Sequence, residues 1–72
     1  MSQAPSLLDV VALTADMPEQ GLCRGQVGTV VEQLSDEVVE VEFSDDRGQA
    51  YAIAPVRVDR LMVLHYRPIK AA

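Results

Sequence analysis

Apolar and charged residues alternate over residues 38–43, VVEVEF. Val39, Val41 and Phe43 fall on one side of an extended chain, and the two glutamates between them fall on the other. A period of two is typical of an antiparallel strand with one buried face and one face in water. This segment therefore predicts a half-buried strand whose outer face is charged.

Four more segments have the β-branched or alternating composition of short strands. They are residues 10–13, 27–34, 49–54 and 61–66. Pro55 is expected to end the fourth strand along the chain, and Arg67-Pro68 the fifth, because proline cannot donate to a ladder. A short helical turn fits residues 6–10, and either a helical turn or an extended linker fits residues 56–60.

Five short strands joined by turns indicate an all-β domain. The chain has 72 residues, too few for a two-sheet sandwich of the immunoglobulin kind. A strongly bent, five-stranded antiparallel barrel is the economical alternative, because closure hides sheet edges. We expect a flexible N-terminus at residues 1–6, the barrel at 7–68 and a C-terminal tail at 69–72. With only three aromatic residues, the core must be mainly aliphatic.

Three glycines, Gly21, Gly25 and Gly28, lie in or just after a long irregular segment, residues 14–26. A phosphate-binding loop would need a lysine after its last glycine, and here Gly28 is followed by threonine and valine. We therefore interpret the glycines as structural. Gly21 and Gly25 permit positive φ, and Gly28 indicates a bulge or a sharp bend. The 14–26 loop is then either a binding loop or a cover over one end of the barrel.

The order of these motifs resembles an SH3-like small barrel of the type shared with KOW modules. The residues that carry this resemblance are Gly25, Gly28, Val30, Val31, Val41, Phe43, Gly48 and Tyr51. More closely, LLDVVALTADMPEQGLCRGQVGTVVE followed by VEVEF resembles a bacterial family of short proteins known only as domain of unknown function 4926. That resemblance covers most of residues 7–66. It implies the SH3-like fold and implies no activity.

The formal net charge is −5, and it is unevenly spread. Residues 32–46 hold seven acids and no basic residue, whereas the basic side chains of the C-terminal part are Arg57, Arg60, Arg67 and Lys70. An acidic chain argues against nucleic-acid binding, which needs a basic face. The 14–26 loop, through which KOW modules can contact RNA, offers only Arg24. A KOW-like RNA-contacting module is therefore the alternative. In that case the C-terminal cations would make the RNA contact.

The sequence offers few candidate residues for catalysis or for metal binding. Cys23 and His65 are the only cysteine and the only histidine, and structural zinc wants four ligands. We interpret Cys23 as a small, partly buried residue and His65 as a packed strand residue. We expect no enzyme activity, no cofactor and no metal. A lone cysteine, with no secretory signal and no long apolar run, favours a cytoplasmic protein and no membrane.

Apolar residues in excess occur near both ends of the chain. Residues 61–64, LMVL, are apolar on both faces of one strand, and residues 7–13 do much the same. The second face must then be covered, either by the 14–26 loop or by another protein chain. The sequence therefore predicts a non-catalytic protein-interaction module that binds itself or another protein. One role of this kind is to neutralise a basic protein.

The predicted partner-binding residues fall into three groups. Apolar contact would come from Leu61, Met62 and Leu64. Arg57 and Arg60 would pair with acids of the partner, and the outer-face residues Glu40 and Glu42 would steer a basic partner.

Overall fold

The computed structural model describes residues 4–70, and its regular segments are five β-strands and two short 3-10 helices. The strands are β1 (Val10–Leu13), β2 (Val27–Gln33), β3 (Val38–Ser44), β4 (Ala50–Arg57) and β5 (Leu61–Val63). The 3-10 helices are η1 (Pro18–Gln20) and η2 (Val58–Arg60). The all-β fold class is confirmed, and η2 provides a short helical turn in the segment 56–60.

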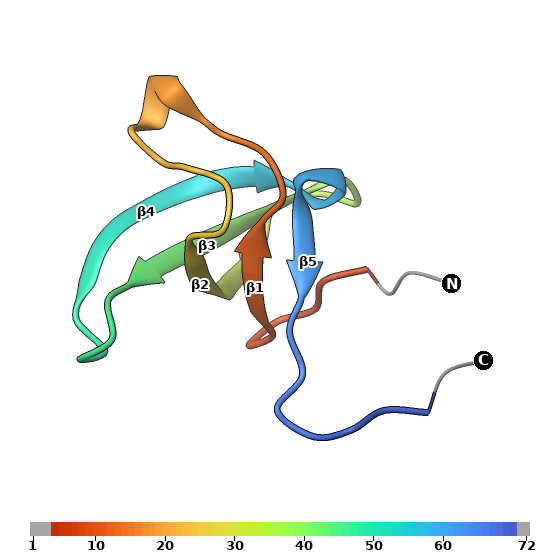
Figure 1. Cartoon of the computed structure of the whole chain (residues 1–72). Helices are drawn as coiled ribbons and strands as arrows, with labels where there is room; N and C mark the ends of the chain where they lie inside the picture. Colours follow the sequence, from red (N-terminus) through yellow and green to blue (C-terminus); the bar gives the residue numbers. More distant parts are fainter. Residues whose placement is uncertain (1–3, 71–72) are drawn as a thin grey trace.

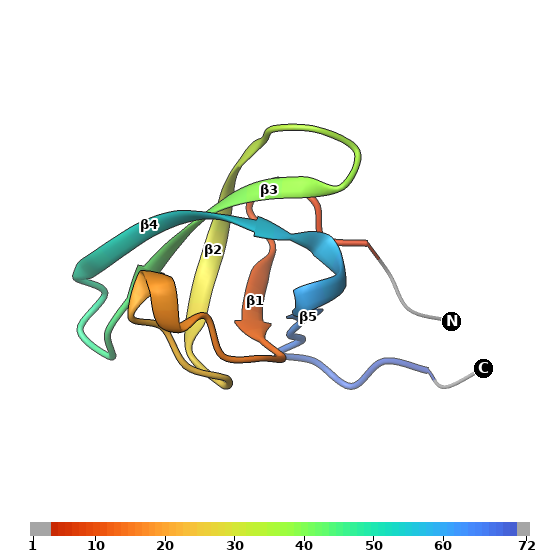
Figure 2. The same ribbon diagram turned by 90° about the horizontal axis from the view of Figure 1, so that it is seen from above.

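The five strands form one antiparallel sheet in the order β4-β3-β2-β1-β5. β4 and β5 are therefore its two edges. The sheet curls strongly, and η2 connects the end of β4 to the start of β5 (Figures 1 and 2). The five-stranded antiparallel sheet is as predicted, whereas its assignment to the SH3-like or KOW-like barrels stays a prediction.

The core lies on the inner face of this curled sheet. One row of it crosses three strands, because Val41 pairs with Val30 on one side and with Ala54 on the other. The buried cluster consists of Val11, Leu13, Leu22, Val30, Val39, Val41, Phe43, Ala54 and Val56. The alternation in VVEVEF is confirmed, since the three apolar residues assigned to the buried side of β3 are all fully buried.

The 14–26 loop covers one end of this core. Met17 and Leu22 form an isolated antiparallel bridge around η1, and Leu22 is buried in the core cluster. Gly21 has a φ of 70° and its N–H donates to the Pro18 carbonyl at 3.1 Å, which ends η1. The loop then returns to the sheet, where the Gly25 N–H donates to the Leu13 carbonyl at 2.8 Å. Of the two roles that the sequence allowed for the 14–26 loop, the covering of one end of the core is therefore present.

Two predicted strand ends were wrong. Pro55 lies inside β4 instead of ending it. β4 is an edge strand, and an edge has one side without a ladder where the missing N–H of a proline does no harm. β5 ends at Val63, so His65 is not a strand residue. The Leu64 N–H still donates to the Val10 carbonyl at 2.8 Å, after which the chain bends.

Glycine occupies position 28 for a reason other than the predicted bulge. The register shifts lie between Val30 and Glu32 and between Phe43 and Ser44, not at Gly28. A Cβ atom at Gly28 would lie 2.6 Å from Val41 Cγ1 and 2.7 Å from the Glu42 carbonyl oxygen. Glycine is needed there because β2 and β3 approach too closely for any side chain.

The segment before β1 is a turn and not a helix or a strand. The Asp9 N–H donates to the Ser6 carbonyl, and the Asp9 carboxylate accepts from the Ser6 N–H at 2.8 Å. Leu8 has a φ of 71° and is 72% exposed. Its neighbour Leu7 is also exposed. The apolar excess of residues 7–13 therefore divides into an exposed pair in this turn and a buried strand.

Candidate protein-interaction surface

The outer face of β1 and β5 carries apolar side chains outside the core cluster. Met62 pairs with Ala12, and Ala12 pairs with Val27, so these three residues form a row across β5, β1 and β2. Their neighbours Val11 and Leu13 point into the core, which places the row on the opposite face. Val10 and Leu64 extend it by a second pair, joined by the hydrogen bond from Leu64 described above.

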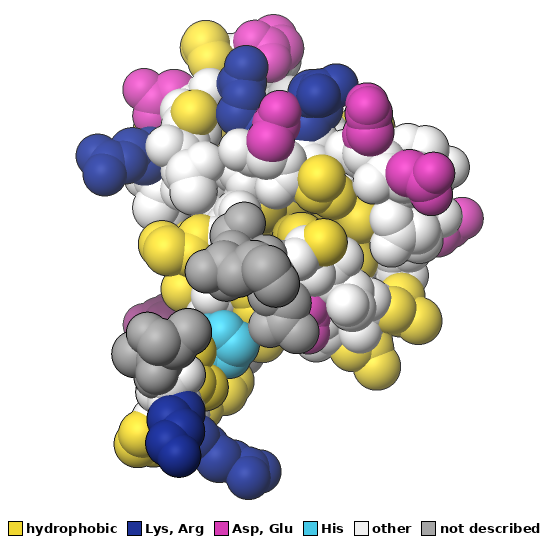
Figure 3. All heavy atoms as spheres, turned by 90° about the vertical axis from the view of Figure 1, so that its right-hand side faces the viewer, with side chains coloured by type: hydrophobic (Ala, Val, Ile, Leu, Met, Phe, Trp, Pro, Cys, Tyr) yellow, Lys and Arg dark blue, Asp and Glu magenta, His cyan; other side chains and the backbone are white. Residues whose placement is uncertain are grey.

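We call these five residues the β1–β5 face: Val10, Ala12, Val27, Met62 and Leu64. Met62 is 53% exposed and Val27 is 40% exposed, whereas Ala12 between them is buried. Figure 3 views the molecule from the side that carries β5. Hydrophobic side chains lie around the centre of this view, and cationic side chains lie both at its upper end, among acidic side chains, and at its lower end, where the C-terminal segment lies.

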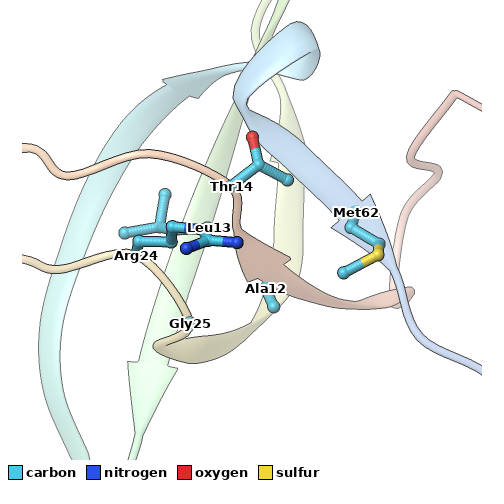
Figure 4. Close-up of a pocket in the computed structure, with 6 residues that line it drawn as sticks. All are labelled: Ala12, Leu13, Thr14, Arg24, Gly25 and Met62. Carbon is cyan, nitrogen blue, oxygen red and sulfur yellow. The ribbon is translucent and has the colours of Figure 1, made fainter.

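A shallow hollow adjoins the β1–β5 face where the 14–26 loop meets the sheet. It has a volume of about 340 Å³ and is lined by Ala12, Leu13, Thr14, Arg24, Gly25 and Met62. Figure 4 shows the Arg24 side chain extending to the end of β1 from one side, while the Met62 side chain lies on the other. The Arg24 backbone is fixed by its N–H, which donates to Asp16 Oδ1 at 2.8 Å. The loop thus borders Met62 without covering it.

The three predicted apolar contacts do not share one face. Leu61 is partly buried and packs against the core cluster, and its contact with a partner stays a prediction. The cause is strand alternation, because Leu61 pairs with the buried Leu13 while Met62 pairs with Ala12. Met62 lies on the exposed side, and Leu64 is half-buried at the end of the strand.

The two predicted cations also differ. Arg57 already has acidic partners in its own chain, Asp59 at 3.3 Å and Glu37 at 3.9 Å. Its hydrogen bond to Asp59, and then the charges of Asp59 and Glu37, raise the pKa of the Arg57 guanidinium above its ordinary value. Arg60 is exposed and joins none of the ion pairs found within residues 4–70. Of the two, Arg60 is the cation without an ion pair in the described part of the chain.

The two predicted acids lie on the outer face of β3, as expected from the alternation. Glu40 pairs with Glu32 of β2, and Glu42 pairs with Thr29. Glu32 is an addition that the sequence did not reveal, because the register shift beside Val31 is needed to bring it opposite Glu40. We call Glu32, Glu40 and Glu42 the acidic row. None of the three is in an ion pair with any other residue of the described chain.

The acidic row and the β1–β5 face belong to one continuous surface. Thr29 pairs with Val10 on β1 and with Glu42 on β3, so a single residue separates the apolar part from the acidic part. Acids and apolar groups therefore lie side by side on the outer surface of the sheet.

Two exposed apolar residues in the C-terminal segment were missed by strand patterns. Tyr66 is 89% exposed and Ile69 is 66% exposed. Tyr66 is the last residue of the predicted fifth strand, and Ile69 follows that strand, where period-two reasoning no longer applies. Their position beside Arg67 and Lys70 was the available signal.

Comparison with known families places the chain. A family model described as Domain of unknown function (DUF4926) matches residues 7–63. The match includes all five strands and ends at the last residue of β5. The chain belongs to the DUF4926 family. No curated protein and no solved structure was found to match it.

Cys23 and His65 of this DUF4926 domain are both exposed, which corrects the predictions of a partly buried thiol and a packed histidine. Cys23 lies in a loop turn where its N–H donates to Gln26 Oε1 at 2.6 Å. His65 borders a second hollow, of about 320 Å³, with Leu64, Tyr66, Arg67 and Ile69. Among residues 4–70, no three His, Cys, Asp or Glu side chains are grouped as metal ligands would be. None of the described helices has the length and apolar character needed to cross a membrane.

Proposed function

We propose that this DUF4926 domain is a non-catalytic protein-interaction module of the bacterial cytoplasm, and that its partner binds the β1–β5 face. The exposed Met62 and Val27 carry this proposal. The outer face of a one-sheet protein is normally polar, and an apolar row beside a hollow is typical of a contact surface. The exposed thiol of Cys23 suits a reducing compartment.

The charges near this face define the chemistry of the partner. Within residues 4–70 the acidic row takes part in no ion pair, and the net charge of the chain is −5. A partner with an apolar centre and a basic rim would complement both parts of the surface and would be attracted at long range. Neutralisation of a basic protein is one role of this kind.

The experiment compares capture of proteins from the lysate of the native organism by three forms of the full chain. The first is the natural chain and the second carries Met62→Asp in the β1–β5 face. The third carries Leu34→Asp, a matched control because Leu34 is 46% exposed and lies beyond the end of β2. Each capture is run with and without nuclease treatment, and circular dichroism checks that each variant is folded.

A stoichiometric protein lost with Met62→Asp and kept with Leu34→Asp is the expected result, because a buried unpaired carboxylate is costly at an interface. Equal capture by all three folded forms would overturn the proposal.

A KOW-like RNA contact is the second candidate, and the C-terminal segment is what favours it. Tyr66 is almost fully exposed beside Arg67, and an aromatic ring with neighbouring cations suits base stacking and phosphate contact. Material lost on nuclease treatment, with affinity falling steeply as salt rises, would favour this candidate.

A further inference from the structure

The C-terminal segment and the outer surface of the sheet have complementary chemistry. Residues 66–70, YRPIK, carry two exposed apolar side chains and two cations. The outer surface carries an exposed apolar row and three carboxylates without ion pairs in the described chain. We propose that a second copy of this chain docks residues 66–70 on that surface, and that the two copies exchange these segments reciprocally. This inference rests on the proposed interaction function and names its occupant.

The sequence of the segment favours a conformation that sorts its side chains. Pro68 fixes its own φ, and it restricts Arg67 to extended or polyproline II geometry. Polyproline II has three residues per turn, so Tyr66 and Ile69 project to one side. Arg67 and Lys70 are also three apart and project to another side. The segment therefore presents an apolar edge and a basic edge next to each other, as the outer surface of the sheet presents an apolar part and an acidic part.

The length of the segment also fits. Five residues of polyproline II extend about 15 Å. Three strand spacings, from β5 across β1 and β2 to β3, are about 14 Å. A segment laid obliquely across the strands would place Tyr66 near Met62 and bring Lys70, at its far end, toward Glu42.

Reciprocal exchange is favoured over folding back within one chain. The Leu64 N–H donates a hydrogen bond to the Val10 carbonyl, and the residues after it lead away from the sheet (Figure 1). The bend at Tyr66 and Arg67 leads the chain away from the sheet, and a return over its own face would require a further turn at the Arg67-Pro68 pair, which favours extended backbone. Two copies related by a twofold axis make the same contact twice without any reversal.

The test is a charge exchange between the two surfaces, measured by sedimentation equilibrium of the full chain over a range of concentrations. The tail variant is Arg67→Glu with Lys70→Glu, and the surface variant is Glu40→Lys with Glu42→Lys. Each variant alone would place like charges together twice per dimer. An equimolar mixture would place opposite charges together at both contacts.

We expect a dimer for the natural chain, a dimer dissociation constant raised about tenfold or more in each single variant, and recovery in the mixture. A natural chain that stays monomeric would overturn the inference, and folding back within one chain would give this result. A dimer that neither variant weakens would also overturn it.

Circular dichroism confirms that the charge variants remain folded, since all four substituted residues lie outside the core cluster. Failure here is distinguishable from failure of the proposed function. A monomeric domain whose lysate partner depends on Met62 would leave the interaction module standing and would exclude only the second copy as its occupant.

Discussion

Strand β3 carries two sets of side chains with opposite surroundings. Val39, Val41 and Phe43 are 0% exposed and contact the aliphatic core. Glu40 and Glu42, one residue away along the same strand, are only half-buried and have no ion pair in the described chain. The inner set is explained completely by folding, because apolar burial is the main stabilising term of so small a domain.

The outer set is not explained by folding. Glu40 lies opposite Glu32 and neither is in an ion pair within the part of the chain that the structure describes, and like charges directly opposite each other destabilise a sheet. On the same outer surface of the sheet, Met62 and Val27 are left exposed. An outer face that is locally unfavourable for the isolated chain is suited to a partner that neutralises and covers it. The following changes test this division between the two faces.

The largest difference is expected within β3 itself. Phe43→Ala removes a fully buried ring and should lower the free energy of unfolding by about 3–5 kcal/mol. A domain of this length has roughly 5 kcal/mol in total, so the variant should be largely unfolded. Glu42→Ala is the matched control on the other face and should change the same quantity by less than about 0.5 kcal/mol. Urea denaturation followed by circular dichroism measures both, and equal effects would refute the division.

A substitution at Gly28 tests how closely the backbones of β2 and β3 approach each other at the inner face. Gly28→Ala would place a methyl group against Val41 and the Glu42 carbonyl, so we expect a loss of about 3 kcal/mol. Gly48→Ala is the control, because Gly48 has a φ of 80° in a turn with no atom within 4 Å of the added carbon. Its cost should be about 1 kcal/mol, from the left-handed backbone alone. If thermal melting ranked the two variants in the reverse order, close strand approach would not be the reason for Gly28.

Leu8, in the exposed turn before β1, tests whether that turn holds backbone strain. A leucine at a φ of 71° lowers the free energy of unfolding by about 1–2 kcal/mol relative to glycine. Its exposed side chain contributes little burial that would offset this loss. Leu8→Gly should therefore stabilise the isolated domain by roughly 0.5 kcal/mol, after the greater flexibility of the unfolded chain is subtracted. Leu7→Gly is the neighbouring control and should not stabilise. A clear loss of stability in Leu8→Gly would show that the leucine side chain makes a contact on which folding depends.

The smallest effect concerns the acidic row. Glu40→Gln removes the repulsion from Glu32 and should raise the free energy of unfolding by about 0.2–0.5 kcal/mol at low salt. The gain should disappear at high salt, because exposed charges are screened. Asp46→Gln, in the exposed turn between β3 and β4, is the control. A gain that persists unchanged at high salt would mean that charge repulsion is not its cause.

Local pattern alone identified most of the strands and one face of the sheet. The two-residue period of VVEVEF fixed which residues of β3 are buried, because alternation is a property of the extended backbone itself. Turn residues and β-branched runs located the strands to within a few residues. The same local logic misplaced the end of the fourth strand, because whether Pro55 is tolerated depends on whether β4 is an edge, and sequence does not state strand order.

The candidate surface was decided by tertiary structure. In LMVL all four residues are apolar, so no pattern separates Leu61, which packs against the core, from Met62, which is exposed. Only pairing with β1 settles it, since Leu61 lies opposite Leu13 and Met62 opposite Ala12. Likewise, Glu32 joins Glu40 only through a register shift in β2. The sequence by itself determined the strands and the inner face of β3, because these follow from neighbours along the chain. The joint placement of apolar and acidic groups on the outer surface follows from neighbours across the sheet, which only pairing and register determine.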